Sequence, residues 1–214
     1  MGGTSPSDLT GRGAGFDRLS ARQYPCRMGT ARDPCPVKLV ASLLATGPTV
    51  LEKARAALSA RLGAIDFQSD VLPFHQTDYY TPEMGTGLVR QVVTFAALAL
   101  PSDLPAAKVV TNDIEQSMAV AGRRTANLDP GYLTQAKLVL ATTKDYAHRL
   151  YLGQGIYGEV TLVFRGGRFR PWPWTYPDYS SEEYCRLFEE IRARYRSQLK
   201  GTPAYSAMSR TSDT

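Results

Sequence analysis

The stretch PVKLVASLLATGPTVLEKARAALSARLG, residues 36–63, decides the fold because it joins a buried strand to an amphipathic helix. Its first ten residues are a leucine-rich and β-branched run, which suits a strand in the core. Pro48 stands in the first turn of the following helix, where proline is accepted. Leucines then recur at helical spacing until Gly63 ends the helix. The stretch therefore predicts a strand over 36–45 followed at once by a helix.

Strand and helix patterns continue to alternate downstream of this unit. A short strand is predicted over 71–76, where a proline limits its length. The apolar run over 90–100 predicts a central strand, although its alanines also fit a helix. The next segment predicts a helix that Ser102 or Asp103 caps and that ends near Gly122.

The chain then changes to turns and short strands. Asp129-Pro130-Gly131-Tyr132 predicts a turn, since proline and glycine supply its backbone angles. The segment over 137–141 fits either a strand or a helix, and 148–152 alternates like a strand. The strand over 159–164 and the glycines of Arg165–Arg168 predict a hairpin.

A capping box of Ser180 and Glu183 starts the last predicted helix. The resulting order is β-α-β-β-α-β plus a hairpin and a terminal helix. It predicts an α+β fold, with a mostly antiparallel sheet and helices packed on one face, ferredoxin-like or related. One globular domain is predicted over 36–200. Disordered segments are predicted over 1–35, which is rich in glycine, serine and arginine, and over 201–214.

Composition narrows the class of protein. The net charge of +5 and the pI near 9.1 are mild, and the surplus arginines are spread between the first residues and the last helix. A strong nucleic-acid binder shows a concentrated basic stripe instead, so RNA is the weaker of the expected partners. Three cysteines without a C-x-x-C pair favour the cytoplasm. No apolar run has the length of a membrane span, so no membrane partner is expected.

The densest chemistry lies between Arg123 and Thr161, where the polar groups are too varied to be buried without partners. Arginine and lysine among polar neighbours bind phosphate or carboxylate groups, and a histidine beside a carboxylate can move protons. The candidate anion-binding residues are Arg124, Asn127, Asp129, Lys144 and Arg149. The candidate proton-transfer residues are His148 with Asp145 or Glu159. An ordinary hydrogen bond within a strand is the alternative role for His148. The carboxylates follow no metal-site spacing, so no metal ligand is assigned, and the cofactor stays unassigned.

The series Gly153-x-Gly155-x-x-Gly158 fits two phosphate-binding patterns, and neither is complete. A Rossmann fingerprint needs a helix after the glycines, whereas a strand follows here. A kinase glycine-rich loop does lie between strands, but its lysine and its H-R-D and D-F-G motifs are missing. The glycines therefore either shape a turn or form an independent phosphate cradle in which Gly153 and Gly155 bind the ligand.

Five segments taken together resemble one known family. They are DYYTPEMG (78–85), TNDIE (111–115), NLDPGY (127–132), TKDYAHRLYL (143–152) and TYPDY (175–179). The family is the uncharacterised prokaryotic domain of unknown function 4416. The resemblance covers about residues 36–195 and implies no established activity. Some similar proteins carry a GTP-binding label, but this chain has no G-x-x-x-x-G-K-[ST] loop to support it.

Two hypotheses for the function follow. The first is a cytoplasmic protein that binds or acts on a phosphorylated or nucleotide-like small molecule. The second is an RNA-binding or protein-interaction module that uses the sheet face, the aromatic segment over 172–179 and the basic last helix. The second predicts tyrosine and tryptophan exposed on an open face. The first predicts one concavity surrounded by Asp129, Lys144, His148, Arg149 and Glu159.

Overall fold

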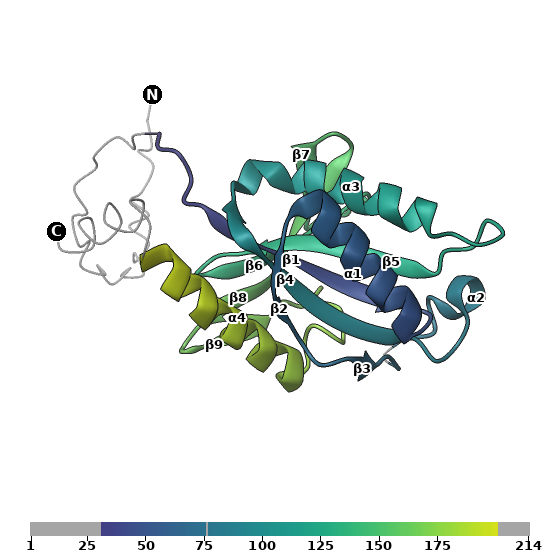
Figure 1. Cartoon of the computed structure of the whole chain (residues 1–214). Helices are drawn as coiled ribbons and strands as arrows, with labels where there is room; N and C mark the ends of the chain where they lie inside the picture. Colours follow the sequence, from purple (N-terminus) through teal and green to yellow (C-terminus); the bar gives the residue numbers. More distant parts are fainter. Residues whose placement is uncertain (1–30, 76, 201–214) are drawn as a thin grey trace, which may run out of the picture. The chain divides into compact units, whose positions relative to one another are not determined.

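Nine antiparallel strands form one sheet in the described part of the chain, which is residues 31–75 and 77–200 of a computed structural model (Figure 1). Strand β1 (Val37–Ala45) lies inside this sheet, between β4 (Val89–Ala99) and β5 (Ala126–Leu133). The other strands are β2 (Ile65–Gln68), β3 (Leu72–Pro73), β6 (Lys137–Thr142), β7 (Leu150–Gly153), β8 (Ile156–Arg165) and β9 (Arg168–Pro171). The helices are α1 (Pro48–Leu62), α2 (Thr81–Met84), α3 (Leu104–Ser117) and α4 (Glu182–Lys200), with a 3-10 turn over Pro101–Asp103. The predicted strand and helix over 36–63 and the predicted central strand are confirmed.

The strand order is β2-β4-β1-β5-β6-β8-β7, with β3 paired to β4 and β9 paired to β8. Helix α1 connects β1 to β2 along the chain, and helix α3 connects β4 to β5. In the sheet, β4 lies between β2 and β1. The predicted strands and helices are present together with the additional strand β2 and the short helix α2, and the α+β class with an antiparallel sheet is confirmed. Further strands lengthen the sheet beyond β5, and the ferredoxin-like assignment stays a prediction.

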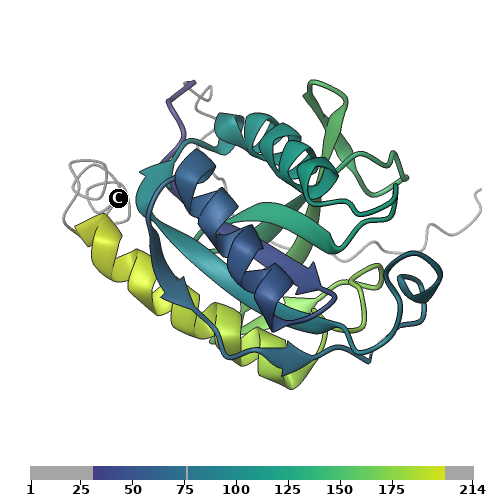
Figure 2. The ribbon, with the colours of Figure 1, turned by 45° about the vertical axis from the view of Figure 1, so that its right-hand side comes forward.

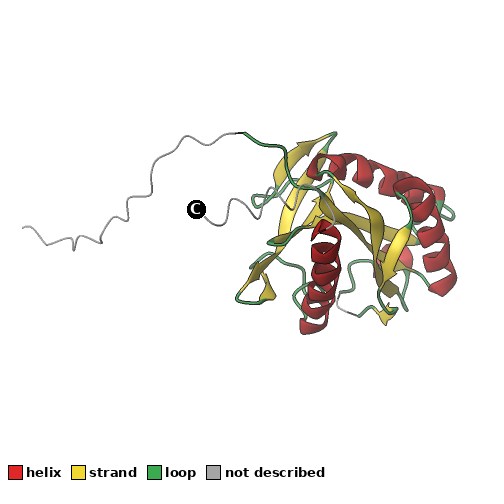
Figure 3. Cartoon of the chain, turned by 60° about the vertical axis from the view of Figure 1, so that its left-hand side comes forward, coloured by secondary structure: helices red, strands yellow, loops and turns green. Residues whose placement is uncertain are grey.

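The helices lie on both faces of the sheet, which corrects the prediction that they cover one face (Figures 2 and 3). Leu39 and Ala41 belong to the core cluster under α1 and α3, whereas Val40 between them packs in the cluster that contains Phe188 and Ile191 of α4. Alternate residues of a strand point to opposite faces, so β1 is buried on both. For that reason its sequence is almost uniformly apolar instead of alternating.

The segment between α1 and β4 differs from its prediction. Strand β2 is not predicted: its residues Ile65-Asp66-Phe67-Gln68 alternate between apolar and polar side chains, but the alternation lasts for only four residues. Of the strand predicted over 71–76, residue 76 lies outside the described residues, and within 71–75 the strand is confirmed only at Leu72–Pro73, which pairs with the start of β4. Short edge strands of this kind leave too few residues for a periodicity to be recognised.

The predicted turn at Asp129–Tyr132 is wrong, because these residues lie in the middle of β5. Strand β5 pairs with β1 along its whole length, but with β6 only over Gly131–Leu133. The first five residues of β5 therefore have one open edge. The backbone N–H and carbonyl of Leu128 point to this open edge, where they are hydrogen-bonded to side chains. Residues two apart in a strand point their backbone groups to the same side, so the Pro130 nitrogen also faces the open edge. Proline has no N–H, and no neighbouring strand accepts a hydrogen bond there. The sheet opens between β5 and β6 at this point.

The glycine series shapes a turn. Gly153 and Gly155 have φ angles of 112° and 74°, and with Gln154 they reverse the chain between β7 and β8. Gly158 lies inside β8, where a Cβ atom would come within 2.9 Å of the Leu152 side chain. The predicted hairpin with its turn at Arg165–Arg168 is confirmed as β8 and β9.

The last helix begins at a different cap from the predicted one. Ser181 Oγ accepts a hydrogen bond of 3.2 Å from the Tyr184 backbone N–H, whereas Ser180 Oγ donates to the Pro177 carbonyl. The neighbouring serine therefore replaces the predicted capping box with Glu183. No helix among the described residues, α4 included, is long and apolar enough to cross a membrane.

Candidate functional site

A cavity of about 600 Å³ lies beside the opening between β5 and β6. Its walls come from α3, the start of β5, the end of β6, the chain around Phe74–Tyr80, the loop after β6 and the segment before α4. Five cations line it: Arg90, Lys108, Arg124, Lys144 and Arg149. Four carboxylates line it as well: Glu115, Asp129, Glu159 and Asp178. A cavity of this size, with charged groups placed among aromatic rings, suits a small-molecule ligand.

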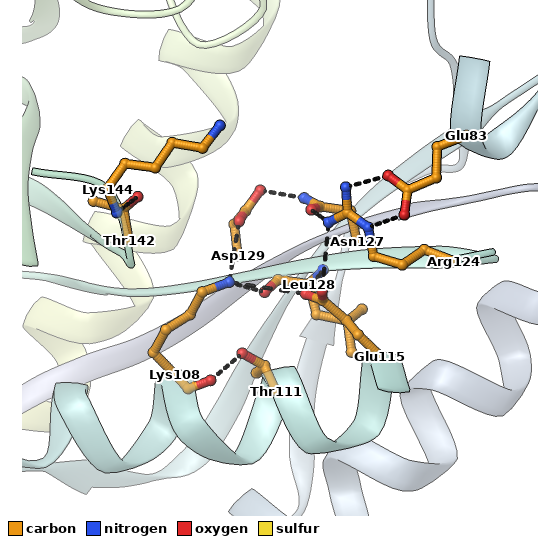
Figure 4. Close-up of polar contacts among 10 residues, drawn as sticks. All are labelled: Glu83, Lys108, Thr111, Glu115, Arg124, Asn127, Leu128, Asp129, Thr142 and Lys144. Carbon is orange, nitrogen blue, oxygen red and sulfur yellow. Dashed lines mark hydrogen bonds and ion pairs between the residues drawn. The ribbon is translucent and has the colours of Figure 1, made fainter. Parts of the chain in front are cut away.

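Helix α3 reaches the open edge of β5 through two charged side chains (Figure 4). Lys108 Nζ donates to the Leu128 carbonyl at 2.9 Å, and Glu115 Oε1 accepts from the Leu128 N–H at 2.7 Å. Lys108 and Glu115 are seven residues apart, which places them two turns apart on one side of the helix. They satisfy the backbone groups that β6 would satisfy in a continuous sheet. Burial raises the pKa of Glu115, and the charge of Lys108 opposes that rise.

A line of hydrogen bonds crosses the floor of the cavity along β5 (Figure 4). Arg124 binds both carboxylate oxygens of Glu83, at 2.8 and 2.6 Å, and donates to Asn127 Oδ1 at 2.9 Å. Asn127 donates to Asp129 at 2.7 Å, and Lys108 lies 3.4 Å from the other oxygen of Asp129. The hydrogen bonds from Arg124 hold the pKa of Glu83 below its usual range. This line gives the Asp129 carboxylate two partners, Asn127 and Lys108.

A second polar group closes the β8 side of the cavity. Glu159 is almost fully buried and accepts from Arg149 Nε at 2.9 Å, while His148 Nε2 lies 3.0 Å from the same oxygen. Arg149 also donates to the Lys144 carbonyl at 3.0 Å and to the Tyr176 hydroxyl at 3.3 Å. Both charges of the pair are thus taken up by neighbours. Their role is to hold the loop after β6 against β8.

Lys144 is the exposed cation of the cavity. Its Nζ donates to the Tyr79 hydroxyl at 2.9 Å across the cavity mouth. This hydrogen bond raises the pKa of Lys144 and lowers the pKa of Tyr79. Among the residues that the structure describes, no carboxylate lies within ion-pair distance of Lys144, whereas each of the other four lining cations has one. Lys144 therefore keeps a positive charge that no neighbouring carboxylate balances.

The structure brings together six of the ten residues that the sequence singles out. Asp145 is exposed outside the cavity lining, and Gly153 and Gly155 lie in the β7–β8 turn away from it. His148 is also outside the lining but contacts two of its residues, Glu159 and Tyr146. The six that line the cavity are Arg124, Asn127, Asp129, Lys144, Arg149 and Glu159.

Four charged lining residues lie outside the segment that the sequence singles out: Arg90, Lys108, Glu115 and Asp178. Arg90 stands at the start of β4, where a charged residue in a strand gives no sign of its partners. Lys108 and Glu115 carry a recognisable signal, because a basic and an acidic residue seven positions apart share one side of the helix, which in α3 is the buried side. Within residues 31–75 and 77–200, no cluster of His, Cys, Asp and Glu has the geometry of a metal site.

Comparison with known proteins gives a family and no activity. The model of a family described as domain of unknown function (DUF4416) matches residues 35–195. The chain belongs to this family, since the match covers most of its length. No curated protein matches the chain, and no solved structure matches it.

Proposed function

We propose that this member of the DUF4416 family binds a phosphorylated or nucleotide-like small molecule in the cavity, with the anionic group at Lys144. The observation that carries the proposal is the charge of Lys144, which lines the cavity without a carboxylate partner among the described residues. An ammonium group in this setting attracts phosphate or carboxylate oxygens. Thr142 and Thr143 line the cavity beside it and add hydroxyl groups.

Three other cations of the cavity already form ion pairs with carboxylates of the protein, which leaves Lys144 as the cation for an anionic ligand. Arg124 holds Glu83, Arg149 holds Glu159, and Lys108 holds Asp129. Their charges are balanced inside the protein, so they shape the walls and leave Lys144 as the anion contact. Six aromatic rings line the same space and give a planar or sugar-like ligand apolar surface to cover. They are Phe74, Tyr79, Tyr80, Tyr146, Tyr176 and Tyr179.

A thermal-shift screen of nucleotides and sugar phosphates, followed by calorimetry, tests this function. We expect at least one phosphorylated compound to raise the Tm, and Lys144→Met to weaken its binding by about tenfold or more, the range for a hydrogen bond to a charged group. The matched control is Lys53→Met, which removes an exposed lysine on α1 outside the cavity. If no compound binds, or if both variants bind it as the wild type does, the proposal is wrong.

RNA binding is the second candidate, and a surface stack of rings supports it. Trp172 stacks on Trp174 and Trp174 stacks on His148, with ring centroids 5.2 Å apart in both cases. Exposed aromatic rings bind the bases of single-stranded RNA. Trp174 already contacts two rings of this stack, however, and its indole N–H donates to the Val160 carbonyl at 3.1 Å, so packing within the protein accounts for its position. The stack therefore supports RNA binding less strongly than the cavity supports a small ligand.

The charges of α4 also give RNA binding less support than the cavity gives a small ligand. Arg186 and Arg194 form ion pairs with glutamates one turn earlier in the helix, Glu182 and Glu190. The basic surface expected of this helix is reduced accordingly. Fluorescence anisotropy with single-stranded RNA at several salt concentrations tests this second function. Binding that falls steeply with salt and is lost in Trp172→Ala would favour it over the first.

A further inference from the structure

The buried polar atoms that lack a hydrogen-bond partner gather at one place beside the cavity. Among the described residues they are Ser42 Oγ, Arg90 Nε and Nη1, and the Tyr179 hydroxyl. Arg90 Nη1 forms an ion pair with Asp178, so its charge is balanced. The Nε and the two hydroxyl groups have no such partner. Buried polar groups are nearly always hydrogen-bonded in folded proteins, so three at one place need a common explanation.

The fold brings these three side chains together on the α4 face of the sheet. Ser42 of β1 is directly opposite Asp129 of β5, and Leu44 is opposite Arg90 of β4, so Ser42 and Arg90 are diagonal neighbours on one face. Tyr179 covers them, with its ring centroid 5.8 Å from the Arg90 guanidinium carbon. Burial raises the pKa of Tyr179; the charge of Arg90 and the contact with the Ser42 hydroxyl oppose that rise, and the charge of Asp129 adds to it.

Arg90 and Tyr179 line the cavity, whereas Ser42 is not one of its lining residues. Arg90 is 3 % exposed and Tyr179 is 3 % exposed, so these donors lie at the deep end, whereas Lys144 lies at the mouth. The cavity thus has a charged end and a buried donor end. A ligand with one anionic group would satisfy the first and leave the second without a partner.

We infer that the donor end binds an uncharged oxygen of the ligand, a carbonyl or a hydroxyl, through Arg90 Nε–H and the Tyr179 hydroxyl, which the neighbouring Ser42 hydroxyl orients. The inference rests on the proposed function, because it names the second group of the molecule whose anion Lys144 binds. Charge decides against a second anion. Asp178 balances Arg90, and Lys108 balances Asp129, so another negative group would face two carboxylates with no cation in excess. The ligand is therefore a phosphorylated compound whose far end is neutral and rich in oxygen.

Calorimetry with three probes tests the inference: inorganic phosphate, glucose 6-phosphate and uridine 5′-monophosphate. The first has only the anion, the second adds hydroxyl groups and the third adds carbonyl groups. We expect at least one organic phosphate to bind at least tenfold more tightly than inorganic phosphate. Tyr179→Phe, and separately Ser42→Ala, should weaken that compound by about two- to tenfold, the range for one neutral hydrogen bond. Both variants should leave inorganic phosphate unchanged.

The matched control is Tyr195→Phe, which deletes a buried hydroxyl that donates to the Pro36 carbonyl away from the cavity. It should leave all three affinities unchanged. If Lys144→Met weakens every probe but Tyr179→Phe and Ser42→Ala do not distinguish organic from inorganic phosphate, the donor end holds only water and this inference alone is wrong. If none of the three probes binds to the wild type, the proposed function fails and the inference fails with it.

Discussion

Two cations are buried on the same face of the sheet, and they differ in how completely they are hydrogen-bonded. Lys38, at one end of β1, is 0 % exposed and donates to Asp66 at 2.5 Å, to the Phe95 carbonyl at 2.7 Å and to Gln198 at 2.8 Å. An ammonium group has three donors, and each has an acceptor. Arg90, near the other end of β1, has Asp178 and a buried Nε without a partner. Complete bonding marks a residue of the framework, and incomplete bonding marks a residue of the cavity.

The surroundings of the two cations explain the difference. Lys38 joins β1 to β2, to β4 and to the end of α4, so its contacts come from elements that the fold fixes. Arg90 lies where β5 has separated from β6 and where the segment before α4 covers the sheet. Secondary structure supplies fewer acceptors there. Four changes test whether this contrast holds, in order of decreasing expected effect.

The largest effect is expected for Asp66→Ala. This change leaves the Lys38 ammonium buried without its carboxylate, and an uncompensated buried charge costs about 3 kcal/mol or more. Urea denaturation measures the free energy of unfolding directly. A loss below about 1 kcal/mol would show that the Phe95 carbonyl and Gln198 alone can satisfy Lys38, and the contrast with Arg90 would disappear.

Asp178→Asn should cost less, about 1–2 kcal/mol, although Asp178 is the more deeply buried of the two carboxylates. Arg90 faces a cavity that water can enter, so its charge can be solvated when the ion pair is removed. The same denaturation experiment compares the two variants. A cost equal to that of Asp66→Ala would mean that Arg90 belongs to a dry framework as Lys38 does.

Acid should lower the free energy of unfolding by protonating Asp66, the ion-pair partner of Lys38. Burial raises the pKa of Asp66, but hydrogen bonds from Lys38 and Thr94 and the charge of Lys38 outweigh it, and the net shift is downward from 3.8. A carboxylate with a lowered folded-state pKa stabilises the protein above its unfolded pKa, and that stability is lost as the pH falls through the folded value. The free energy of unfolding should therefore decrease below about pH 4. Asp66→Asn should make this decrease shallower, and an unchanged slope would contradict the assignment.

The smallest effect is expected for Tyr179→Phe in the protein without ligand. Its hydroxyl is buried without a hydrogen bond, so replacing it by hydrogen should change the stability by about 0 kcal/mol or improve it slightly. Tyr195→Phe removes a hydroxyl that does have an acceptor and should cost about 1 kcal/mol. Thermal unfolding of the two variants side by side gives the comparison. Equal losses would show that Tyr179 has an acceptor after all.

The sequence predicts the individual strands and helices of this fold better than it predicts their arrangement in the sheet. The run over 36–45 predicts a buried strand correctly. Because nearly all its residues are apolar, both faces of this strand must be covered, and helices lie on both. The turn predicted at Asp129–Tyr132 is wrong, because proline and glycine are typical of turns and these residues lie in a strand. A strand accepts the proline here because this part of β5 has an open edge. That edge depends on where β6 stops pairing, which no local pattern records.

The candidate site divides in a similar way. Its residues on β5, on β8 and in the loop after β6 lie within one segment, so a local search finds Arg124, Lys144 and Arg149. Arg90 and Lys108 come from elements earlier in the chain and join them only through strand order. The glycine series attracts attention by its resemblance to phosphate-binding loops, but the positive φ angles show it forming a turn between two strands.

The bond from the Leu128 amide to Glu115 has a practical consequence. A backbone N–H that donates to a carboxylate forms a charge-assisted hydrogen bond, which is short and sensitive to the charge of its acceptor. Glu115 in turn faces the same cavity as Lys144. The amide resonance of this single leucine is therefore a built-in spectroscopic reporter. Its chemical shift and its exchange rate with solvent should register an occupied cavity before the ligand has been identified.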